Sequence, residues 1–398
     1  MSRTVRSVLF STLYPSAARP MHGLFVETRL RELLKTGSVE ARVVAPVPWF
    51  PSTSPRFGDY ARFACTPLRE VRSGIDIQHP RYLLPPRIGM TLAPLLLALG
   101  ARAALRRLRN DGFDFDVIDA HYYYPDGVAA ALLGRHFSRP VVVTARGSDI
   151  NLIADRALPR RMLQWADRNV RASIGVSAAL VQRMLQLHFD PRHLHVMRNG
   201  VDLDRFRPSD RAFERRALGI DGEGPVILTV GNLHEHKGQG LAIEALAILR
   251  RRHADARLLV VGEGPDRDAL LARSTALGLD GAVRLVGPVP NAELYRWYSA
   301  ADLLVLASSR EGWPNVLLES MACGTPVVAT DVGGVREIVQ GESAGRVARH
   351  RTPQSVADAM HDLLDTMPDH TAVRSYAQGF GWLSTSQAQL ALFQTLFD

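Results

Sequence analysis

Cysteine and lysine are both scarce in this chain of 398 residues. It has two cysteines, Cys65 and Cys323, far apart in sequence, and two lysines, Lys35 and Lys237. Two isolated thiols exclude a disulfide framework and a cysteine-based zinc site, and they favour a reducing cytoplasm as the location. No low-complexity tract stands out, and no repeat of about 20–50 residues, so a solenoid or repeat array is also excluded.

Long apolar runs are absent as well. The most apolar stretch, residues 88–105, contains Pro94, Gly100 and Arg102. It never reaches the roughly 18 uninterrupted apolar residues of a membrane-spanning helix. Near the N-terminus, two arginines precede an apolar run that is too brief for a signal peptide. We therefore expect no membrane span and no secretory signal.

The charge is unevenly distributed. Residues 1–205 carry 29 Lys and Arg against 17 Asp and Glu, a net charge of +12, whereas the remainder carries 19 against 23, a net charge of −4. A basic half suits an anionic membrane surface, an anionic acceptor or nucleic acid. The plain alternative is a scatter of solvated arginines. Nucleic acid is the least favoured partner, because no compact Lys/Arg run or recognition motif accompanies the charge.

Strand-like apolar runs alternate with helical patterns, which is typical of doubly wound parallel sheets. The first predicted strands cover residues 5–13, 41–45, 116–120, 140–144, 173–176 and 195–197. After a Pro- and Asp-rich connection, the second set covers residues 225–230, 257–261, 283–286, 303–306 and 327–329. We predict an α/β fold with two Rossmann-like domains, 1–204 and 205–375, that face a central cleft and bind ligands at the carboxyl ends of their strands. Residues 49–90 have the weakest periodicity and are predicted to form a mobile loop region.

Two glutamates eight positions apart, Glu311 and Glu319, flank a predicted helix start. Pro314 suits an early helical position, and Gly324 suits the helix end. Backbone N–H groups at a helix start lack partners and favour a phosphate. Glu319 leans back toward that start, where its carboxylate can accept from two neighbouring hydroxyls, as on a ribose. Glu311, in the loop, is placed to reach a second sugar, and the alternative is that both are solvated surface charges.

Residues 310–334 resemble the Glu-x7-Glu motif of retaining glycosyltransferases with the GT-B fold, in particular the group often called family 4. The match continues through Met321-Ala-Cys-Gly-Thr-Pro-Val-Val-Ala-Thr330 to Gly333-Gly334. The resemblance implies a nucleotide diphosphate sugar as donor, with no divalent metal or other cofactor. The final segment, 376–398, is predicted to be helical from its apolar residues Trp382, Leu390, Phe393 and Phe397, and the resemblance implies that it returns to brace the first domain. The residues that it places at the donor are Glu311, Gly312, Trp313, Pro314, Asn315, Val316 and Glu319.

Lys237 follows the predicted strand 225–230. Beside a helix start it adds a full positive charge where backbone donors already favour phosphate, and the alternative is a surface lysine at a turn. The segment resembles the family's Gly-Arg-Leu-x3-Lys-Gly element, whose Arg and Lys hold the donor diphosphate. Asn232 stands where that Arg is expected. The candidates to replace the missing cation are Arg146, Arg198 and Arg310.

Two glycine loops also follow predicted strands. Gly23 resembles the family's N-terminal glycine loop that approaches the donor, and its alternative is an ordinary loop glycine. Gly262 and Gly264 resemble the family's Gly-x-Gly-Pro loop near the nucleobase. A dinucleotide-binding fingerprint is disfavoured there, because Arg267 occupies the position of its third glycine.

His121 ends the predicted strand 116–120 and resembles the second His of the family's His-x-His element, which lies beside the transferred sugar. Asp119 occupies the place of the first His. The alternative for a lone histidine is a structural or surface role. The segment Thr144-Ala-Arg-Gly-Ser-Asp-Ile150 ends another strand, and its Arg146 or Asp149 meets acceptor or donor unless the Asp simply caps a turn.

The resemblance and the residues together predict a retaining glycosyltransferase that moves a hexosyl-type unit from a nucleotide diphosphate sugar to a polysaccharide, lipid-linked or small-molecule acceptor. Lys237 is expected to stabilise the departing phosphate, and Glu311 and His121 to orient the sugar. We expect a cytoplasmic enzyme of cell-envelope polysaccharide synthesis, peripheral at the inner membrane face. The alternatives are a GT-B sugar-nucleotide epimerase, a nicotinamide-dependent oxidoreductase and a non-catalytic sugar-nucleotide-binding partner.

Overall fold

The structure, a computed structural model, describes residues 3–85 and 89–397. The chain divides into two compact units: unit 1 is Met1–Arg198 with Leu383–Asp398, and unit 2 is Asn199–Trp382. The predicted boundaries at 204/205 and 375/376 lie a few residues inside unit 2. Val201 pairs with Gly381 in an isolated β-bridge. This pairing joins the entry and exit segments of unit 2 at one place.

Within its described residues, unit 1 is built on an eight-stranded sheet in the order β10-β9-β8-β7-β1-β2-β5-β4. Neighbouring strands are parallel, except for the antiparallel pair β4 and β5. The strands are β1 (Val5–Phe10), β2 (Val39–Val44), β4 (Arg69–Arg72), β5 (Ile75–Gln78), β7 (Val117–His121), β8 (Val141–Ala145), β9 (Ala172–Gly175) and β10 (Leu194–Val196). A separate parallel pair comprises β3 (Val47–Pro48) and β6 (Arg81–Tyr82).

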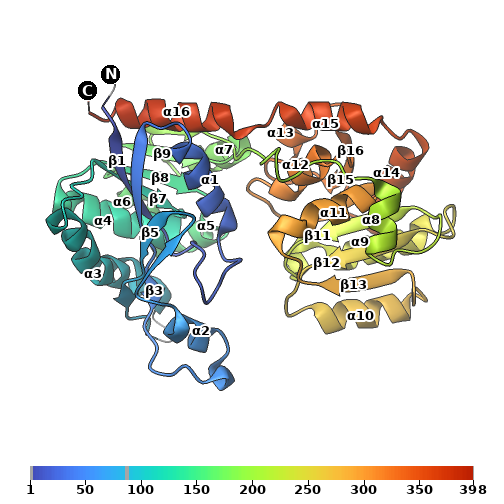
Figure 1. Ribbon diagram of the computed structural model, residues 1–398, viewed down its shortest axis with the longest axis horizontal. Helices are drawn as coiled ribbons and strands as arrows, with labels where there is room; N and C mark the ends of the chain where they lie inside the picture. Colours follow the sequence, from blue (N-terminus) through green and yellow to red (C-terminus); the bar gives the residue numbers. More distant parts are fainter. Residues whose placement is uncertain (1–2, 86–88, 398) are drawn as a thin grey trace. The chain divides into compact units, whose positions relative to one another are not determined.

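Helices cover both faces of this sheet (Figure 1), as the almost continuously apolar strands β7, β8 and β9 require. The α-helices are α1 (Leu24–Leu34), α2 (Asp59–Cys65), α3 (Gly89–Asn110), α4 (Val128–Phe137), α5 (Ser148–Asn151), α6 (Ala157–Asp167), α7 (Ala178–Gln186) and α16 (Trp382–Gln394). Shorter helical turns are η1 (Pro55–Phe57), η2 (Tyr123–Gly127), η3 (Ile153–Asp155) and η4 (Pro191–His193).

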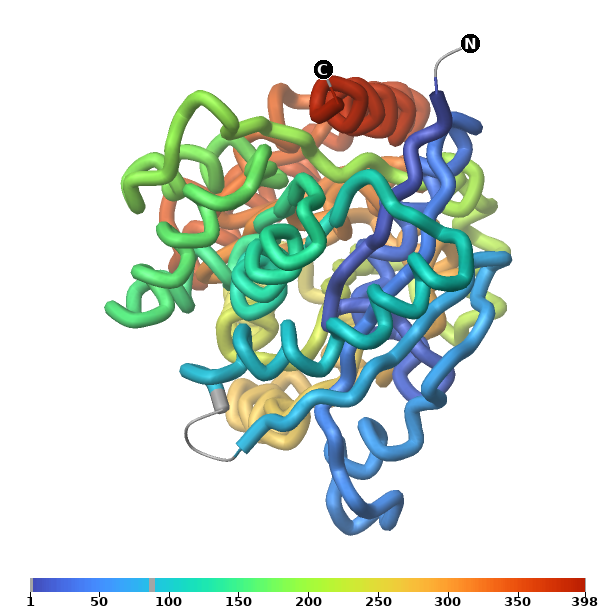
Figure 2. The backbone as a smooth tube through the Cα atoms, turned by 90° about the vertical axis from the view of Figure 1, so that its left-hand side faces the viewer, coloured from blue at the N-terminus to red at the C-terminus, as the bar shows by residue number. Residues whose placement is uncertain are grey.

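Helix α16 packs on the sheet of unit 1. Phe393 is fully buried in a cluster that includes Val5, Val117 and Ile174. The Arg3 guanidinium lies 5.9 Å from the centre of the Phe397 ring, so the two ends of the described chain lie close together (Figures 1 and 2). The last segment of the sequence therefore completes the core of the first unit.

The prediction of one helix over residues 376–398 is wrong for residues 376–397, the part of it that the structure describes. Helix α15 (His370–Gln378) ends before Gly379, and α16 begins at Trp382. The two glycines in Gly379-Phe380-Gly381 have low helix propensity, and the backbone there is used otherwise, because Val201 N donates to Phe380 O at 2.9 Å. The apolar spacing alone did not reveal this break.

The prediction of a loop without regular elements over residues 49–90 is also wrong for the residues that the structure describes, whereas the mobility of this stretch stays a prediction; residues 86–88 lie outside the described residues. This stretch contains α2 and the hairpin of β4 and β5. Ser73 and Gly74, with φ of 50° and 76°, form the two-residue turn of the hairpin. β5 then adds to the sheet by pairing in parallel with β2. Strands of four residues are too short to produce a clear period in the sequence.

Unit 2 has a six-stranded, all-parallel sheet in the order β13-β12-β11-β14-β15-β16 across its described residues. The strands are β11 (Val226–Val230), β12 (Arg257–Val261), β13 (Val283–Gly287), β14 (Leu303–Leu306), β15 (Val327–Thr330) and β16 (Gly345–Ala348). This is the Rossmann order, which reverses between β11 and β14. Ligands in such sheets bind outside the carboxyl ends of the strands at that point.

Helices also flank the sheet of unit 2 (Figure 1). They are α8 (Arg211–Ala217), α9 (Gln239–Leu249), α10 (Arg267–Ala276), α11 (Leu294–Ala300), α12 (Asn315–Ala322), α13 (Val335–Ile338), α14 (Pro353–Asp365) and α15, with the turns η5 (Glu235–Lys237) and η6 (Asn291–Glu293). Among the helices that the structure describes, none has the length and apolarity needed to cross a membrane.

Candidate functional site

Lys237 and Glu311 meet at the point where the strand order of unit 2 reverses. Lys237 lies in the loop after β11, and Glu311 lies in the loop after β14. Lys237 Nζ donates to Glu311 Oε1 at 2.8 Å, and Ser308 Oγ donates to the same oxygen at 2.7 Å. The structure thus brings together two of the predicted catalytic residues from segments more than 70 positions apart. Ser308 was not predicted, because no motif or spacing distinguishes it from the other serines of the chain.

Gly238 allows these two loops to approach each other. It has φ of 76°, in the left-handed region, and it caps the N-terminus of α9. A Cβ added at this position would lie 2.0 Å from the carbonyl oxygen of Ala307, the residue that precedes Ser308. Any larger residue would therefore push the Lys237 loop away from the Glu311 loop.

The loop after β12 packs against the loop after β11. A Cβ on Gly262 would lie 2.0 Å from Gly231 O, and one on Gly264 would lie 2.4 Å from Leu233 O. Leu233 N donates to Glu263 O at 2.9 Å. The two glycines therefore allow close packing that holds the backbone of the loop after β11 in place. This loop carries the exposed Asn232.

Helix α12 begins beside Glu311. Its N-cap residue is Pro314, which provides no side-chain hydrogen bond to the first amides. Trp313 is buried, and its indole Nε1 donates to Asn199 O at 2.9 Å. The Asn199 side chain also donates to Asn315 Oδ1 at 3.4 Å. The amides of Asn315 and Val316 thus form a fixed, positively polarised helix start.

Glu319 lies one helical turn beyond that start. Tyr298, a fully buried residue of α11, donates its hydroxyl to Glu319 Oε2 at 2.8 Å. Burial raises the pKa of Glu319 to about 7, although this hydrogen bond and the nearby Arg205 oppose the rise. The carboxylate is therefore near half-ionised at neutral pH. Tyr298 was missed at the sequence level, because nothing marks it among the aromatic residues of a buried helix.

Among the three candidates to replace the missing cation, Arg310 lies in the same unit as Lys237. Arg310 is exposed, and it lies close enough to His236 to contribute, after burial, to a lowered pKa of that imidazole. Arg146 and Arg198 belong to unit 1. Arg310 therefore lies near the loop after β11, which carries His236 and Lys237.

His121 ends β7 in unit 1 and is buried. Its Nε2 contacts Asp119 Oδ2 at 3.2 Å, and its Nδ1 contacts the Arg146 guanidinium. Burial, reinforced by Arg146, lowers the pKa of His121 to about 4, so the ring is neutral at pH 7. Both ring nitrogens have protein partners, and contact between His121 and a sugar stays a prediction.

Arg146 and Asp149 follow β8. The Arg146 guanidinium lies over the Phe25 ring at 5.1 Å, and burial, followed by the charge of Arg29, lowers its pKa to about 9. The Asp149 carboxylate accepts backbone N–H groups from Tyr123 at 2.6 Å and Gly147 at 2.8 Å. These hydrogen bonds match the alternative in which Asp149 caps a turn. The Arg146 guanidinium contacts His121.

Tyr122 has a strained backbone immediately after His121. Its φ is 83°, which is rare for a bulky residue and costs about 1–3 kcal/mol. The backbone is held by the bond from Tyr122 N to Thr144 O at 2.9 Å, and the hydroxyl contacts Ser148 Oγ at 2.8 Å. Such strain at a strand end marks a candidate binding position that one sequence cannot reveal.

A cavity of about 250 Å³ lies in unit 1 at the carboxyl ends of β1, β2 and β5. Its polar lining includes Arg19 and His22, whose side chains are 3.0 Å apart. Burial, with a smaller effect of Arg19, lowers the pKa of His22 to about 4, which leaves Arg19 as the charged member of the pair. Gly23 follows His22 and packs against the backbone of Leu13. The cavity suits a hydroxyl-bearing or anionic group.

The fold and these loops define a two-domain enzyme of the GT-B class. Residues 29–205 match the profile of Glycosyltransferase Family 4, and residues 210–380 match that of Glycosyl transferases group 1. The D-inositol 3-phosphate glycosyltransferase of Frankia alni is 33% identical over 304 residues, which are 70% of this chain and 74% of that protein. The chain therefore belongs to the family 4 glycosyltransferases.

Solved structures show the same fold. Sucrose-phosphate synthase from Thermosynechococcus elongatus superposes with a TM-score of 0.79 at 19% identity, covering 99% of each chain. Alr3699/HepE of Anabaena, solved in complex with UDP-glucose, superposes with a TM-score of 0.73 at 20% identity, covering 98% of this chain and 99% of that one. The predictions of family, GT-B fold and glycosyltransferase activity are confirmed.

Proposed function

We propose that this glycosyltransferase transfers a hexosyl-type unit, with retention, from a nucleotide diphosphate sugar to a polysaccharide, lipid-linked or small-molecule acceptor. The observation that carries the proposal is the Lys237–Glu311 pair beside the start of α12, at the switch point of a Rossmann sheet. The UDP-glucose complex of the Anabaena protein, which shares the fold, supports the choice of donor class.

The proposed role of each residue follows from the charges that develop as the anomeric bond of the donor breaks. Cleavage of the anomeric bond builds negative charge on the leaving diphosphate and positive character on the sugar. Lys237 and the amides at the start of α12 stabilise that negative charge, and they do so most strongly in the transition state. Glu311 exchanges part of its contact with Lys237 for hydroxyls of the sugar, and Glu319 accepts from the ribose. Asn232, Gly262 and Gly264 shape the neighbouring loops of unit 2. Gly23, in unit 1, stays a predicted donor contact.

Unit 1 supplies the acceptor side in this proposal. His121 is neutral and hydrogen-bonded on both ring nitrogens, so it acts by position and hydrogen bonding rather than as a strong base. The departing phosphate takes the proton of the acceptor hydroxyl, which needs no divalent metal or other cofactor. The cavity beside Arg19 and the strained Tyr122 are the acceptor-side features of this unit.

Product analysis tests the function. A thermal-shift panel of nucleotide sugars selects the donor, because a ligand of the folded state raises the apparent stability by mass action. Incubation with that donor and candidate acceptors is then followed by NMR of the anomeric centre. We expect a glycosylated acceptor with the anomeric configuration of the donor. An inverted product contradicts retention, a free altered donor identifies an epimerase, and no turnover with any pair identifies a binding partner.

Asn232→Arg should tighten the binding of the nucleoside diphosphate. The substitution adds a cation at the exposed position where the resemblance to the Gly-Arg-Leu-x3-Lys-Gly element predicts Arg, in the loop that also carries Lys237. Isothermal titration is expected to show a severalfold lower Kd. The control is Asn232→Gln, which adds length without charge and should leave Kd unchanged. Equal Kd values for the Arg variant and the parent chain would show that Arg310 or another cation already fills this role.

We propose that the enzyme works at the cytoplasmic face of a membrane, with α3 of unit 1 against anionic lipid. Leu92, Leu95 and Leu99 are exposed at helical spacing on α3, and Arg102 and Arg106 continue the same stripe. The basic charge of this half of the sequence complements an anionic surface.

The double variant Arg102→Glu/Arg106→Glu should abolish co-sedimentation with vesicles that contain anionic phospholipid. The reversed charges repel the surface, whereas the matched change Arg251→Glu/Arg252→Glu, at an exposed turn of unit 2, should leave binding intact. Donor hydrolysis in solution reports that both variants are folded. If the parent chain stays in the supernatant with anionic vesicles at low salt, the membrane proposal fails.

A further inference from the structure

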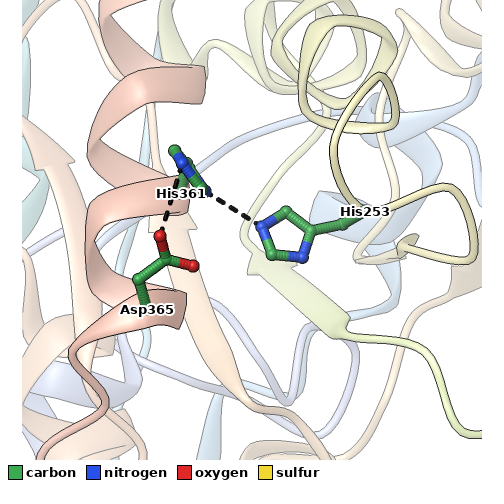
Figure 3. A group of neighbouring side chains, drawn as sticks. All are labelled: His253, His361 and Asp365. Carbon is green, nitrogen blue, oxygen red and sulfur yellow. Dashed lines mark hydrogen bonds and ion pairs between the residues drawn. The ribbon is translucent and has the colours of Figure 1, made fainter.

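Two histidines and an aspartate gather in unit 2 where α9 and α14 lie side by side (Figure 3). His253 follows the C-terminal end of α9, and His361 and Asp365 lie one turn apart on α14. The two helices share a buried apolar cluster that includes Leu249 and Met360. The cluster of polar side chains therefore stands on a rigid base.

The backbone of His253 is held in place although it lies outside a helix. Its N–H donates to Leu249 O at 3.0 Å, and its carbonyl accepts from Ala256 N at 2.9 Å. These bonds anchor the turn after α9, so the imidazole projects from a fixed position toward α14 (Figure 3). A ring on a fixed turn and a ring on a packed helix are a preorganised pair.

The contacts place one nitrogen of each imidazole against the other ring. His361 Nε2 lies 3.4 Å from Asp365 Oδ2, and His361 Nδ1 lies 3.0 Å from His253 Nε2. In the tautomer with its hydrogen on Nε2, on the side of Asp365, His361 presents the lone pair of Nδ1 to His253. Two imidazole nitrogens then share one hydrogen between them. An ion that replaces this hydrogen meets two nitrogen ligands.

We propose that His253 Nε2 and His361 Nδ1 bind a divalent transition metal, with Zn²⁺ as the best fit, and that Asp365 orients His361 from the other side of its ring. Two nitrogens on a tetrahedral Zn²⁺, each about 2.0–2.1 Å from the ion, are roughly 3.3 Å apart. The observed 3.0 Å needs only a slight opening. A carboxylate that accepts the second N–H of a ligating histidine is the usual supporting partner. Water completes the coordination on the solvent side, because all three side chains are at least partly exposed.

The metal site is separate from the donor site. Helix α9 starts directly after Gly238, and His253 lies beyond its other end. Eleven helical residues span about 16 Å, so an ion here does not touch the transferred sugar or its phosphates. It joins α9 to α14 and stabilises unit 2. The proposal is independent of the metal-free transfer chemistry.

The test uses the full chain without a histidine tag, after treatment with chelator. Isothermal titration with ZnCl₂ should show one ion per chain, and ZnCl₂ should raise Tm. Co²⁺ should give the visible absorption of a nitrogen-ligated ion. His253→Gln and His361→Gln should lose the titration signal and the rise in Tm. Asp365→Asn should bind about 10–100-fold more weakly, as expected for a supporting carboxylate.

Two matched variants separate this site from other histidines. His350→Gln changes an exposed histidine of unit 2 outside the cluster, and His236→Gln removes one ring of the stacked pair with His234 near the donor loop. Both should keep the full response. An unchanged titration in His253→Gln, loss of the signal in His236→Gln, or no response of the parent chain to Zn²⁺ or Co²⁺ would each overturn the proposal and leave the cluster as a hydrogen-bonded link between two helices.

Discussion

Lys237→Ala should lower kcat/KM for the donor by about 100- to 1000-fold. Loss of one preorganised donor to a developing negative charge costs about 2.7–4 kcal/mol in the transition state. The ammonium group lies at the strand-order switch of unit 2 and is fixed by Glu311 at 2.8 Å. Steady-state kinetics with the selected nucleotide sugar measure the effect, and most of it should fall on kcat, because the charge develops as the bond breaks.

The other lysine of the chain provides a matched control. Lys35 forms an exposed ion pair with Glu32 at the end of α1, so Lys35→Ala should leave transfer unchanged. Lys237→Ala/Glu311→Gln tests whether the pair acts as a unit, in which case the double variant costs much less than the two single effects combined. Normal kinetics in Lys237→Ala would assign the phosphate to another cation, with Arg310 the first candidate.

Glu319→Ala should weaken donor binding by tenfold or more, equivalent to about 1.4 kcal/mol. The carboxylate has one oxygen on the Tyr298 hydroxyl, and the proposed ribose contacts use the remaining acceptor capacity. Titration calorimetry with the donor measures the loss. Glu342→Ala, at an exposed loop position of the same unit, is the control and should bind normally.

The pH dependence of binding gives a second signature of Glu319. Its pKa is raised to about 7, so the acceptor form of the carboxylate predominates above pH 7 and is lost as the pH falls below it. Donor affinity should therefore fall between pH 8 and 6, and Glu319→Gln should remove this step. The diphosphate of a nucleotide sugar does not titrate in that range, so a step of equal size in the variant would assign the titration elsewhere.

The raised pKa of Glu319 also allows a loss of donor binding to be distinguished from a loss of folding stability. An acid whose pKa is raised in the folded state destabilises that state as the pH rises from the unfolded pKa, about 4.3, through the folded value near 7. Glu319→Gln removes this penalty, so its Tm at pH 8 should equal or exceed that of the parent chain. Weaker donor binding together with an undiminished Tm is then a direct effect on the site.

The sequence predicted the strands of unit 2 well for a physical reason. Buried parallel strands require unbroken apolar runs, and the predicted strands 257–261 and 303–306 match β12 and β14 in both bounds. The loops after such strands are then placed by topology alone. That is why Lys237 and Glu311 were predicted together although they are far apart in sequence.

The parts that escaped prediction depend on contacts between distant segments or on backbone angles. His121 contacts Arg146 from the loop after another strand, β8, and no spacing rule links them. The positive φ of Tyr122 is imposed by its surroundings on a residue that ordinarily avoids it. Helix α3 was obscured because Pro94 and Gly100 interrupt its apolar pattern, yet the packing of its buried face outweighs their low propensity.

The most direct measurement pairs a change in the protein with a change in the ligand. The affinities of the selected nucleoside diphosphate and of its 2′,3′-dideoxy analogue are compared by titration calorimetry for the parent chain and for Glu319→Ala. If the carboxylate holds the ribose, removing the hydroxyls weakens binding tenfold or more in the parent chain and has almost no further effect in Glu319→Ala. Equal losses in both proteins would show that the hydroxyls bind elsewhere and that the donor is not held by these loops.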